Sequence, residues 1–541
     1  MRFRIQITIL LLALVFPAGA QSVIKLGQEK PQQEKSLEKF ERALDVINRY
    51  YVDTVDNQKM VEQAIISMLK QLDPHSNYFT AEQIKRANED LEGTFEGVGV
   101  EFQIIEDTPT VMIINPDGPA ERGGILQGDQ ILRIGGEAST GSSITTGWVS
   151  RKVRGDKGSE VVFTVVREGE KEPLQITVIR DKIPTYSVNS WFMLNENTGY
   201  IKISRFMRTT VPEFEEALRE LKKQNMDGLI LDLRGNTGGL LKSAVQLADH
   251  FLGKDKVIVY TEGLNHQRLD YKTTGKGLYR KGRLVVLIDE NTASASEIVT
   301  GAIQDWDRGI VMGSRSFGKG LVQKPYSLPD GSAIRLTIAR YHTPVGRCIQ
   351  RPYEQGRERY YEEMNEKIRL GVYSDADSMN LHDSLRYQTP GGRIVYGGGG
   401  IMPDIFVAAD TSGNSELLTS LHRSNMFNRY ALYMVRHHKD SLLGLYPGVE
   451  DFLALKGNAT PLLEDFSWFA AGYEIAPDEK MLAHSGPSIE RQVMSSLGRL
   501  LYGNKASWQI QGIYDPLVKQ AIGVIAEEES SRLFKVSQQT E

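Results

Sequence analysis

The alternation of apolar strands with amphipathic helices, from about residue 185 onward, most constrains what this chain can fold into. The strand-like segments read TGYIKISRF, GLILDLRG, RLVVLIDE and RGIVMGSRS, and the helical segments between them read VPEFEEALRELKKQ, LLKSAVQLADHFL and SEIVTGAIQDW. Strands that alternate with helices pair into a sheet with the helices packed around it. The sequence therefore predicts an α/β core.

The rest of the 541 residues divides into further regions that differ in hydrophobic pattern and composition. Short alternating strands with glycine turns predict a compact β-rich module of ordinary domain size after the first helices. We predict a signal peptide (1–20), an N-terminal helical region (21–92), the β-rich module (93–183), the α/β core (184–408, with an insertion at 351–393) and a mainly helical C-terminal region (409–541).

The N-terminus has the pattern of a secretory signal. Arg2 and Arg4 precede an apolar run, and Ala18-Gly19-Ala20 offers a small-residue cleavage site. The alternative is a membrane anchor, but about twelve apolar residues are too few for a hydrocarbon core that needs about twenty. A single cysteine, Cys348, precludes an internal disulfide. Export without disulfides favours a bacterial periplasm.

The net charge of −5 gives no basic excess, so the sequence predicts no nucleic-acid partner. The stretch GSRSFGKG at 313–320 matches a phosphate loop except at its last position, where Gly320 replaces the Ser or Thr that holds magnesium. A nucleotide-binding ATPase or GTPase is one reading of this stretch. Gly320 argues against it, and we predict no nucleotide and no other cofactor.

Two residues in the core could carry nucleophilic chemistry. Ser294 stands where a strand runs through a loop into a helix, a place where backbone N–H groups favour negative charge. Its spacing to Glu297 is also that of a capping box, and spacing alone favours the cap. Lys319 could act as a base if burial lowered its pKa by about three units, although a lone lysine is by default a surface residue.

Two further features are weaker. The segment LDLRGNTGGLL at 231–241 leads from a strand into a turn where Gly238 and Gly239 could bring backbone N–H groups close to a carbonyl. Glycine turns after strands are usually only turns. The segment LDPHSNYF at 72–79 stops a helix, and we interpret His75 in it as a turn histidine satisfied by neighbouring backbone.

Taken together these segments resemble the carboxyl-terminal processing peptidases, or tail-specific proteases, a Ser-Lys family with a PDZ domain. The motifs LDPHSNYF, FEGVGVEF, GPAERGGILQGDQILRIGGE, LDLRGNTGGLL, TASASEI, GSRSFGKGLVQ and GGGGIMPDI occur in the family's order. The resemblance covers most of the mature chain. It implies a multidomain α/β protein with a crotonase-like protease core, an inserted PDZ domain at 93–183 and helical N- and C-terminal regions.

The resemblance also implies roles for individual residues. Ser294 corresponds to the nucleophile, Lys319, 25 residues later, to its base, and Gln323 to the residue that orients the lysine. The oxyanion donors would be the amide of Ala295 and one in the turn formed by Gly238 and Gly239.

Substrate tails would bind to the PDZ domain by strand addition, with the carboxylate in the loop Gly97-Val98-Gly99-Val100. The implied reaction is serine acyl transfer on protein or peptide substrates with apolar C-termini. The N-terminal helices could pair in a homodimer, and an adaptor could take part. The alternatives are a non-catalytic PDZ adaptor on an inactive core and a histidine-based serine hydrolase.

Overall fold

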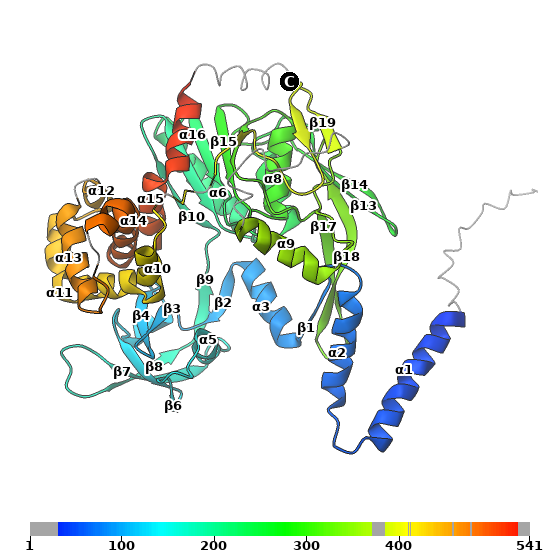
Figure 1. The fold of residues 1–541 in the computed structure, drawn as a ribbon, viewed down its shortest axis with the longest axis horizontal. Coiled ribbons are helices and arrows are strands. Elements are labelled where there is room, and N and C mark those ends of the chain that lie inside the picture. Colours follow the sequence, from blue (N-terminus) through cyan, green and yellow to red (C-terminus); the bar gives the residue numbers. More distant parts are fainter. Residues whose placement is uncertain are drawn as a thin grey trace, which may run out of the picture. The chain divides into compact units, whose positions relative to one another are not determined.

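The computed structural model describes residues 31–369, 385–408, 410–411, 413–456, 459–476 and 479–527. The chain divides into two compact parts, Met1–Ile65 and Ile66–Glu541 (Figure 1). The predicted signal peptide, 1–20, lies outside the described residues. Within these ranges, no helix combines the length and the apolar character that crossing a bilayer requires.

The first part contains helix α1 (Pro31–Tyr50) and the start of α2 (Asn57–Lys70). Helix α1 exposes several large apolar side chains, among them Leu37, Phe40 and Tyr50. The predicted helical pattern of this region is therefore present in both helices, and it continues in α3 (Ala81–Glu92) of the second part.

The second part is built around a six-stranded sheet in the order β10, β11, β12, β15, β16, β21. The strands are β10 (Val188–Met193), β11 (Thr198–Ile203), β12 (Gly228–Asp232), β15 (Arg283–Ile288), β16 (Ile310–Gly313) and β21 (Ile405–Phe406). All neighbouring pairs are parallel except β10 with β11. The predicted α/β core is confirmed in its alternation of strands and helices.

Helices cover both faces of this sheet, which is why its central strands read as continuous apolar runs. On one face, Leu229 and Leu231 pack with residues of α6 (Thr210–Lys223), α7 (Leu241–Asp249) and α8 (Ala295–Asp305). On the other face, Ile230 packs with Val518 and Ala521 of α16 (Pro516–Ala526). The end of the predicted C-terminal region therefore forms part of the core's packing (Figure 1).

A buried ionic cluster joins α16 to the end of β12. The carboxylate of Asp232 contacts Lys202 Nζ at 3.0 Å, Tyr200 OH at 2.7 Å and Arg234 Nη2 at 2.6 Å. Arg234 also pairs with Asp515, the N-cap of α16, at 2.8 Å. Burial opposes ionisation of Asp232, but Arg234 and Lys202 hold its pKa well below its ordinary value.

A second sheet packs beside the first and contains a strand that the sequence did not predict. It joins β1 (Asn77–Phe79), β18 (Ala333–His342), β13 (Val257–Gly263) and β14 (His266–Lys272), with β17 (Leu321–Ser327) also paired to β18. We expected a helix stop and a turn before α3, and β1 follows that turn. Its partner β18 lies more than 250 residues away, so no local pattern indicates the pairing.

The β-rich module forms a five-stranded antiparallel path, β3, β4, β5, β7 and β8, with β6 paired to β5. Its elements are β2 (Thr94–Gly97), β3 (Val100–Ile105), β4 (Thr108–Ile114), α4 (Pro119–Gly123), β5 (Gln130–Ile134), β6 (Glu137–Ala138), α5 (Thr146–Val153), β7 (Glu160–Val166), β8 (Leu174–Ile179) and β9 (Asp181–Pro184). Strand β9 returns to pair with β2, which closes the module. Strand β3 ends the sheet path.

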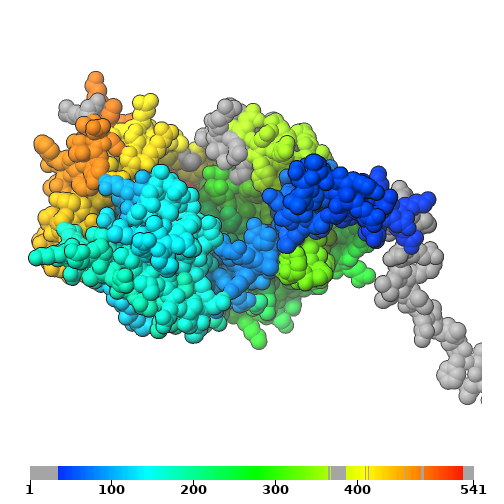
Figure 2. Space-filling view, turned by 90° about the horizontal axis from the view of Figure 1, so that it is seen from below, coloured from blue at the N-terminus to red at the C-terminus, as the bar shows by residue number. Residues whose placement is uncertain are grey.

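The C-terminal helices pack on the module as well as on the core. They are α10 (Glu416–Arg423), α11 (Met426–Leu445), α12 (Val449–Leu453), α13 (Thr460–Ala471), α14 (Glu479–Tyr502) and α15 (Asn504–Tyr514). Ile105 and Met112 of the module share an apolar cluster with Leu432 and Leu497 of these helices. Figure 2 shows the cyan surface of the module beside the yellow to orange surface of these helices.

The predicted insertion, 351–393, contains helix α9 (Arg357–Arg369) and strand β19 (Arg386–Gln388), which pairs with β20 (Ile394–Tyr396). Helix α9 contacts the start of β1 in the second sheet, where Arg357 Nη2 donates to Asn77 Oδ1 at 3.0 Å, and its Tyr360 ring meets that of Phe317. The insertion therefore contributes a helix to the neighbourhood of the loop that carries Lys319.

Candidate active site

The residues singled out in the core lie in three loops that follow adjacent parallel strands. The turn with Gly238 and Gly239 follows β12, the loop with Ser294 follows β15, and the loop with Lys319 follows β16. In open α/β sheets, ligands bind at the carboxyl ends of the strands because the loops from neighbouring strands converge there. The strand order therefore brings these predicted residues to one edge.

Ser294 directly precedes α8 and has φ 56° and ψ −114°. A positive φ is unfavourable for a residue larger than glycine: it costs about 1–3 kcal/mol, and it persists only where the surrounding structure holds the residue in place. Strained residues of this kind cluster at functional sites. The geometry presents Ser294 on a sharp turn at the positive end of a fully buried helix.

Glu297 holds that turn, as the capping-box spacing suggested. Its Oε2 accepts a hydrogen bond from the Ser294 N–H at 2.7 Å. The Glu297 N–H donates to the carbonyl oxygen of Ser294 at 2.9 Å. Since that carbonyl takes the return bond, the serine hydroxyl is not needed as the cap.

The same carboxylate also binds the lysine loop. Its Oε2 accepts from the Lys319 N–H at 2.9 Å, and its Oε1 accepts from the Gly318 N–H at 2.7 Å and from Ser316 Oγ at 2.6 Å. Glu297 is fully buried. Burial raises the pKa of its carboxyl to about 7, and the four donors oppose that rise. One side chain thus ties the serine turn to the lysine loop.

Tyr341 of β18 makes a second connection between the two loops. Its hydroxyl contacts the carbonyl oxygen of Ser294 at 3.1 Å and also that of Lys319. Its backbone N–H donates to the carbonyl oxygen of Gly320 at 3.0 Å. The ring is almost completely buried. The two loops are therefore fixed by a residue of the second sheet as well as by Glu297.

The amine of Lys319 is partly buried and points to Gln323. Lys319 Nζ donates to Gln323 Oε1 at 3.1 Å, and Gln323 Nε2 donates to the carbonyl oxygen of His75. Burial lowers the pKa of Lys319 from its ordinary value of 10.5, and the charge of Arg335 lowers it further. Glu297 opposes this shift more weakly. The environment therefore shifts the balance toward the neutral amine, the form that can accept a proton.

His75 is more than the turn histidine that we inferred from the sequence. Its ring is buried and its Nε2 lies 3.2 Å from the hydroxyl of Tyr360 in α9, while its carbonyl oxygen binds Gln323. The interpretation that neighbouring backbone satisfies the ring is therefore wrong. Tyr360 lies 285 residues further along the chain, so only the folded chain brings the two residues together.

The glycine turn packs directly against the serine. A Cβ added to Gly238 would stand 2.8 Å from Ser294 Cβ and 2.9 Å from the nitrogen of Ala295. A Cβ added to Gly239 would meet the carbonyl oxygen of Phe206 at 2.1 Å. Both glycines have positive φ, 100° and 144°. Only glycine fits this close approach, which brings the turn beside the backbone of Ala295.

Asn236, which the sequence analysis did not single out, anchors this turn from within the core. Its side chain is fully buried, donates to the carbonyl oxygen of Ile203 at 3.0 Å and accepts from the Gly238 N–H at 2.9 Å. The backbone carbonyl oxygen of Asn236 accepts from the Ala293 N–H at 3.0 Å and from Ser296 Oγ at 2.9 Å. Ser296 is thereby a structural partner of the turn.

Gly320, the residue that breaks the phosphate-loop pattern, has a steric reason to be glycine. A Cβ at this position would stand 2.9 Å from the nitrogen of Gln350. The Gly320 N–H also donates to Gln350 Oε1 at 2.8 Å. The loop is thus packed against another segment of the chain through this glycine.

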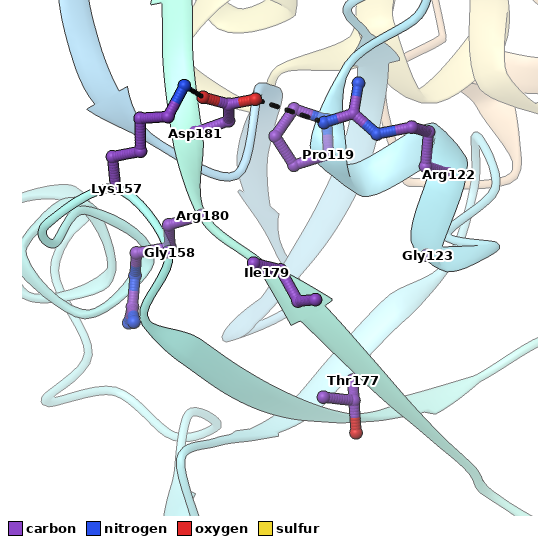
Figure 3. A pocket seen from close by; sticks show the side chains of 9 residues that line it. All are labelled: Pro119, Arg122, Gly123, Lys157, Gly158, Thr177, Ile179, Arg180 and Asp181. Atoms are coloured by element: carbon purple, nitrogen blue, oxygen red, sulfur yellow. Dashed lines mark hydrogen bonds and ion pairs between the residues drawn. The ribbon is translucent and has the colours of Figure 1, made fainter.

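The segment Gly97-Val98-Gly99-Val100 lies in the β-rich module, where it joins the end of β2 to the start of β3. Gly99 has a φ of 76°, and Val98 is buried in the module's own core. A neighbouring hollow is lined by Pro119, Arg122, Gly123, Lys157, Gly158, Thr177, Ile179, Arg180 and Asp181 (Figure 3). Asp181 pairs there with Lys157 at 2.7 Å and with Arg122 at 3.4 Å.

Four residues with clear positions in this site were missed or undervalued: Glu297, Tyr341, Asn236 and His75. Glu297 had a sequence signal in its capping-box spacing, which indicates only a helix start. Tyr341 and His75 act through contacts with residues distant in sequence, and no local pattern indicates such contacts.

Models of known protein families match most of these regions. The model of Peptidase family S41 matches residues 197–355, and a PDZ domain model matches 97–178. The Activating protease CtpB N-terminal domain matches 17–83, and a Family of unknown function (DUF8443) matches 417–503.

Individual relatives are similar over more than half of this chain. "Carboxy-terminal processing protease CtpB" of Bacillus subtilis is 36% identical over 331 residues, which cover 60% of this chain and 68% of that protein. The "Carboxy-terminal-processing protease" of Bartonella bacilliformis is 34% identical over 337 residues, 61% of this chain and 76% of that protein.

Among solved structures, the photosystem II D1 C-terminal processing protease matches with 29% identity, a TM-score of 0.34, and coverage of 57% of this chain and 89% of that one. The extent and identity of the two curated relatives establish the family. This chain belongs to the S41 peptidases, the family of the carboxy-terminal processing serine proteases, and carries a PDZ domain.

Proposed function

We propose that this protein cleaves protein substrates near their C-termini with Ser294 as nucleophile, Lys319 as general base and Gln323 as the residue that orients the lysine. The observation that carries the proposal is that the side chains of Glu297 and Tyr341 form hydrogen bonds with both the serine turn and the lysine loop. We further infer that the core is of the crotonase-like type, which accords with its mixed sheet and surrounding helices.

The reaction is acyl transfer. Neutral Lys319 takes the proton from the Ser294 hydroxyl as the oxygen attacks the scissile carbonyl carbon, and the ammonium later gives a proton to the leaving amine. Water then attacks the acyl-enzyme, with Lys319 again taking the proton, and releases the new C-terminus. The lowered pKa of Lys319 supports this role because a base must be unprotonated to act.

Two backbone amides beside Ser294 stabilise the oxyanion in this proposal. One is the amide of Ala295 at the start of α8, where the helix dipole favours negative charge. For the second donor, the Gly238 N–H is already bound to Asn236 Oδ1 at 2.9 Å. We therefore assign the second donor to the N–H of Gly239, because the adjacent Gly238 packs directly against Ser294.

The PDZ domain selects the substrate in this proposal. An apolar C-terminal tail adds as a strand beside β3, which ends the sheet path, and its carboxylate binds in the loop Gly97-Val98-Gly99-Val100. Recognition by the PDZ domain and cleavage by the core are separate steps, which makes the activity tail-specific.

Export through a cleaved signal at residues 1–20 into the periplasm completes the proposal and rests on the sequence. Pairing of two copies through the N-terminal helices is consistent with the exposed apolar side chains of α1. A mass-spectrometric comparison of the C-termini of exported proteins, with and without active enzyme, would identify the substrates.

The catalytic assignment is tested by single substitutions. Ser294→Ala and Lys319→Ala should each reduce cleavage of an unstructured substrate with an apolar C-terminus by at least about 1,000-fold, because each removes a reacting group. The matched control is Lys324→Ala, an exposed lysine on β17. Activity that survives Lys319→Ala but is lost on replacing one histidine would support the histidine-based alternative. An inactive wild-type protein would support the adaptor alternative.

The role of the PDZ domain is tested on one substrate in two forms. Amidation of the substrate's C-terminus removes the carboxylate charge that the loop amides bind, so KM should rise by about tenfold while kcat stays the same. The measurement is steady-state cleavage of the free-acid and the amide forms of the same peptide. Equal KM values for the two forms would contradict carboxylate recognition.

The base assignment predicts a pH effect of Arg335. Replacing it in Arg335→Gln removes a positive charge that disfavours the Lys319 ammonium, so the pKa of Lys319 should rise. Because only the neutral amine is active, the acid limb of kcat/KM should move to higher pH, as measured between about pH 5 and pH 10. Arg340→Gln, an exposed arginine on the same strand, should leave the profile in place.

The hold of Glu297 is tested by Glu297→Gln, which keeps the volume of the side chain. An amide has one acceptor oxygen and an NH₂ group, so two of the four donors would face another donor. We expect kcat to fall by about 100-fold through misplacement of the serine and the lysine, with a lower Tm. Glu290→Gln, in the loop that precedes α8, should change neither, because the glutamine oxygen can still accept from Ser314 Oγ. A lower Tm with normal kcat would restrict Glu297 to a structural role.

A further inference from the structure

The turn at Asp73–Asn77 lies between the catalytic glutamine and helix α9. On one side, the carbonyl oxygen of His75 accepts the hydrogen bond from Gln323 Nε2. Asp73 keeps the turn compact, because its carboxylate accepts from the N–H groups of His75 and Ser76, both at 2.8 Å. The position of the His75 carbonyl is therefore a property of the whole turn.

Helix α9 holds the other side of this turn. The Tyr360 hydroxyl lies 3.2 Å from His75 Nε2, and the two rings meet edge to face with their centroids 5.4 Å apart. The Tyr361 hydroxyl donates to the carbonyl oxygen of Pro74 at 3.2 Å, and Arg357 Nη2 donates to Asn77 Oδ1 at 3.0 Å. Of these contacts, only that of Tyr360 reaches the residue that binds the glutamine.

Tyr360 also contacts the lysine loop. The guanidinium of Arg351 lies 4.3 Å from the ring centre of Tyr360 and 4.6 Å from that of Phe317. The Arg351 N–H donates to the carbonyl oxygen of Gly318 at 3.0 Å. The two aromatic rings themselves meet edge to face at 6.2 Å. Tyr360 thus touches the catalytic loop through Arg351 and Phe317 and the catalytic glutamine through His75.

The orientation of the Gln323 amide matters for the chemistry. A side-chain amide has an acceptor end and a donor end that are nearly equal in size. If the amide turned over, its N–H would donate to the lone pair of neutral Lys319, the pair that must accept the serine proton. The His75 carbonyl can only accept, so it holds Nε2 to itself and leaves Oε1 facing the lysine.

The neutral state of His75 accords with this arrangement. Burial lowers the pKa of His75 to about 4, and a positive charge on Lys319, whenever that amine is protonated, acts in the same direction. A neutral imidazole has one donor and one acceptor nitrogen, and Nε2 pairs with the Tyr360 hydroxyl in either role. A charged ring would disfavour protonation of Lys319 during the reaction.

We propose that Tyr360 is a positioning residue for the cleavage reaction: it holds His75 so that the His75 carbonyl orients the Gln323 amide toward Lys319. This inference rests on the Ser294, Lys319 and Gln323 assignment of the proposed function. It gives the segment 351–393, which interrupts the family motifs, a role in catalysis through α9.

Tyr360→Phe and Tyr360→Ala test this role. Loss of the hydroxyl alone should lower kcat by about fivefold, and loss of the ring, which lets the turn shift, by about 100-fold. KM should stay within about twofold, since the tail-binding PDZ domain is untouched. The matched control is Tyr326→Phe, an exposed tyrosine on the same strand as Gln323, which should have wild-type kcat. Thermal unfolding establishes that each variant is folded.

A double-mutant comparison separates positioning from a purely structural effect. If Tyr360 acts through Gln323, then Tyr360→Phe should change the rate in a Gln323→Ala background by less than about twofold. The rate to measure is phosphonylation of Ser294 by a fluorophosphonate probe, in which the serine oxygen displaces fluoride from phosphorus, followed by mass spectrometry over hours so that slow variants are resolved.

Three outcomes overturn the inference: wild-type kcat in both Tyr360 variants, the same fivefold loss with and without Gln323, or a loss that appears only in KM. Failure of the proposed function looks different. In that case Lys319→Ala or Gln323→Ala would cleave the substrate and react with the fluorophosphonate at the wild-type rate, whatever the Tyr360 variants do.

Discussion

The buried carboxylate of Glu297 is the interaction on which the arrangement of the site depends. A carboxylate removed from water is unfavourable unless hydrogen bonds replace its hydration. Here four donors do so, and they come from two loops that follow different strands. Because each carboxylate oxygen can accept two bonds, a single side chain fixes the serine turn and the lysine loop relative to each other. If the hydrogen bonds from either loop were lost, the buried charge would lack part of its compensation, so the two loops stay in place together.

The sheet makes that interaction possible by placing the loops side by side. Strands β12, β15 and β16 are parallel neighbours, and the glycine turn, Ser294 and Lys319 each follow one of them. Helices on both faces bury these strands, and the cluster at Asp232 ties the C-terminal helix α16 to the start of the glycine turn. The contacts that position the site therefore come from the core strands in the middle of the chain and from α16, the last described helix.

Much of the core was predictable because its signals are local. Apolar runs and amphipathic periods indicate strands and helices within windows of a few residues, and the predicted alternation matches the core sheet. Motif order led to the family, which the comparisons establish. Glu297 was predictable only as a helix cap. Strand β1, the ring partner of His75 and the role of Tyr341 were not predictable, since each depends on residues far apart in sequence.

By itself, the sequence determined the elements of the core, the order of its motifs and the chemical types that stand at the strand ends, because these follow from short-range pattern and composition. Only the tertiary structure decided which groups meet. It brought His75 to Tyr360 and Gln323, placed Tyr341 beneath both loops and gave Gly320 its steric reason. The physical reason is that packing and hydrogen bonding join residues by distance in space, which a linear pattern does not record.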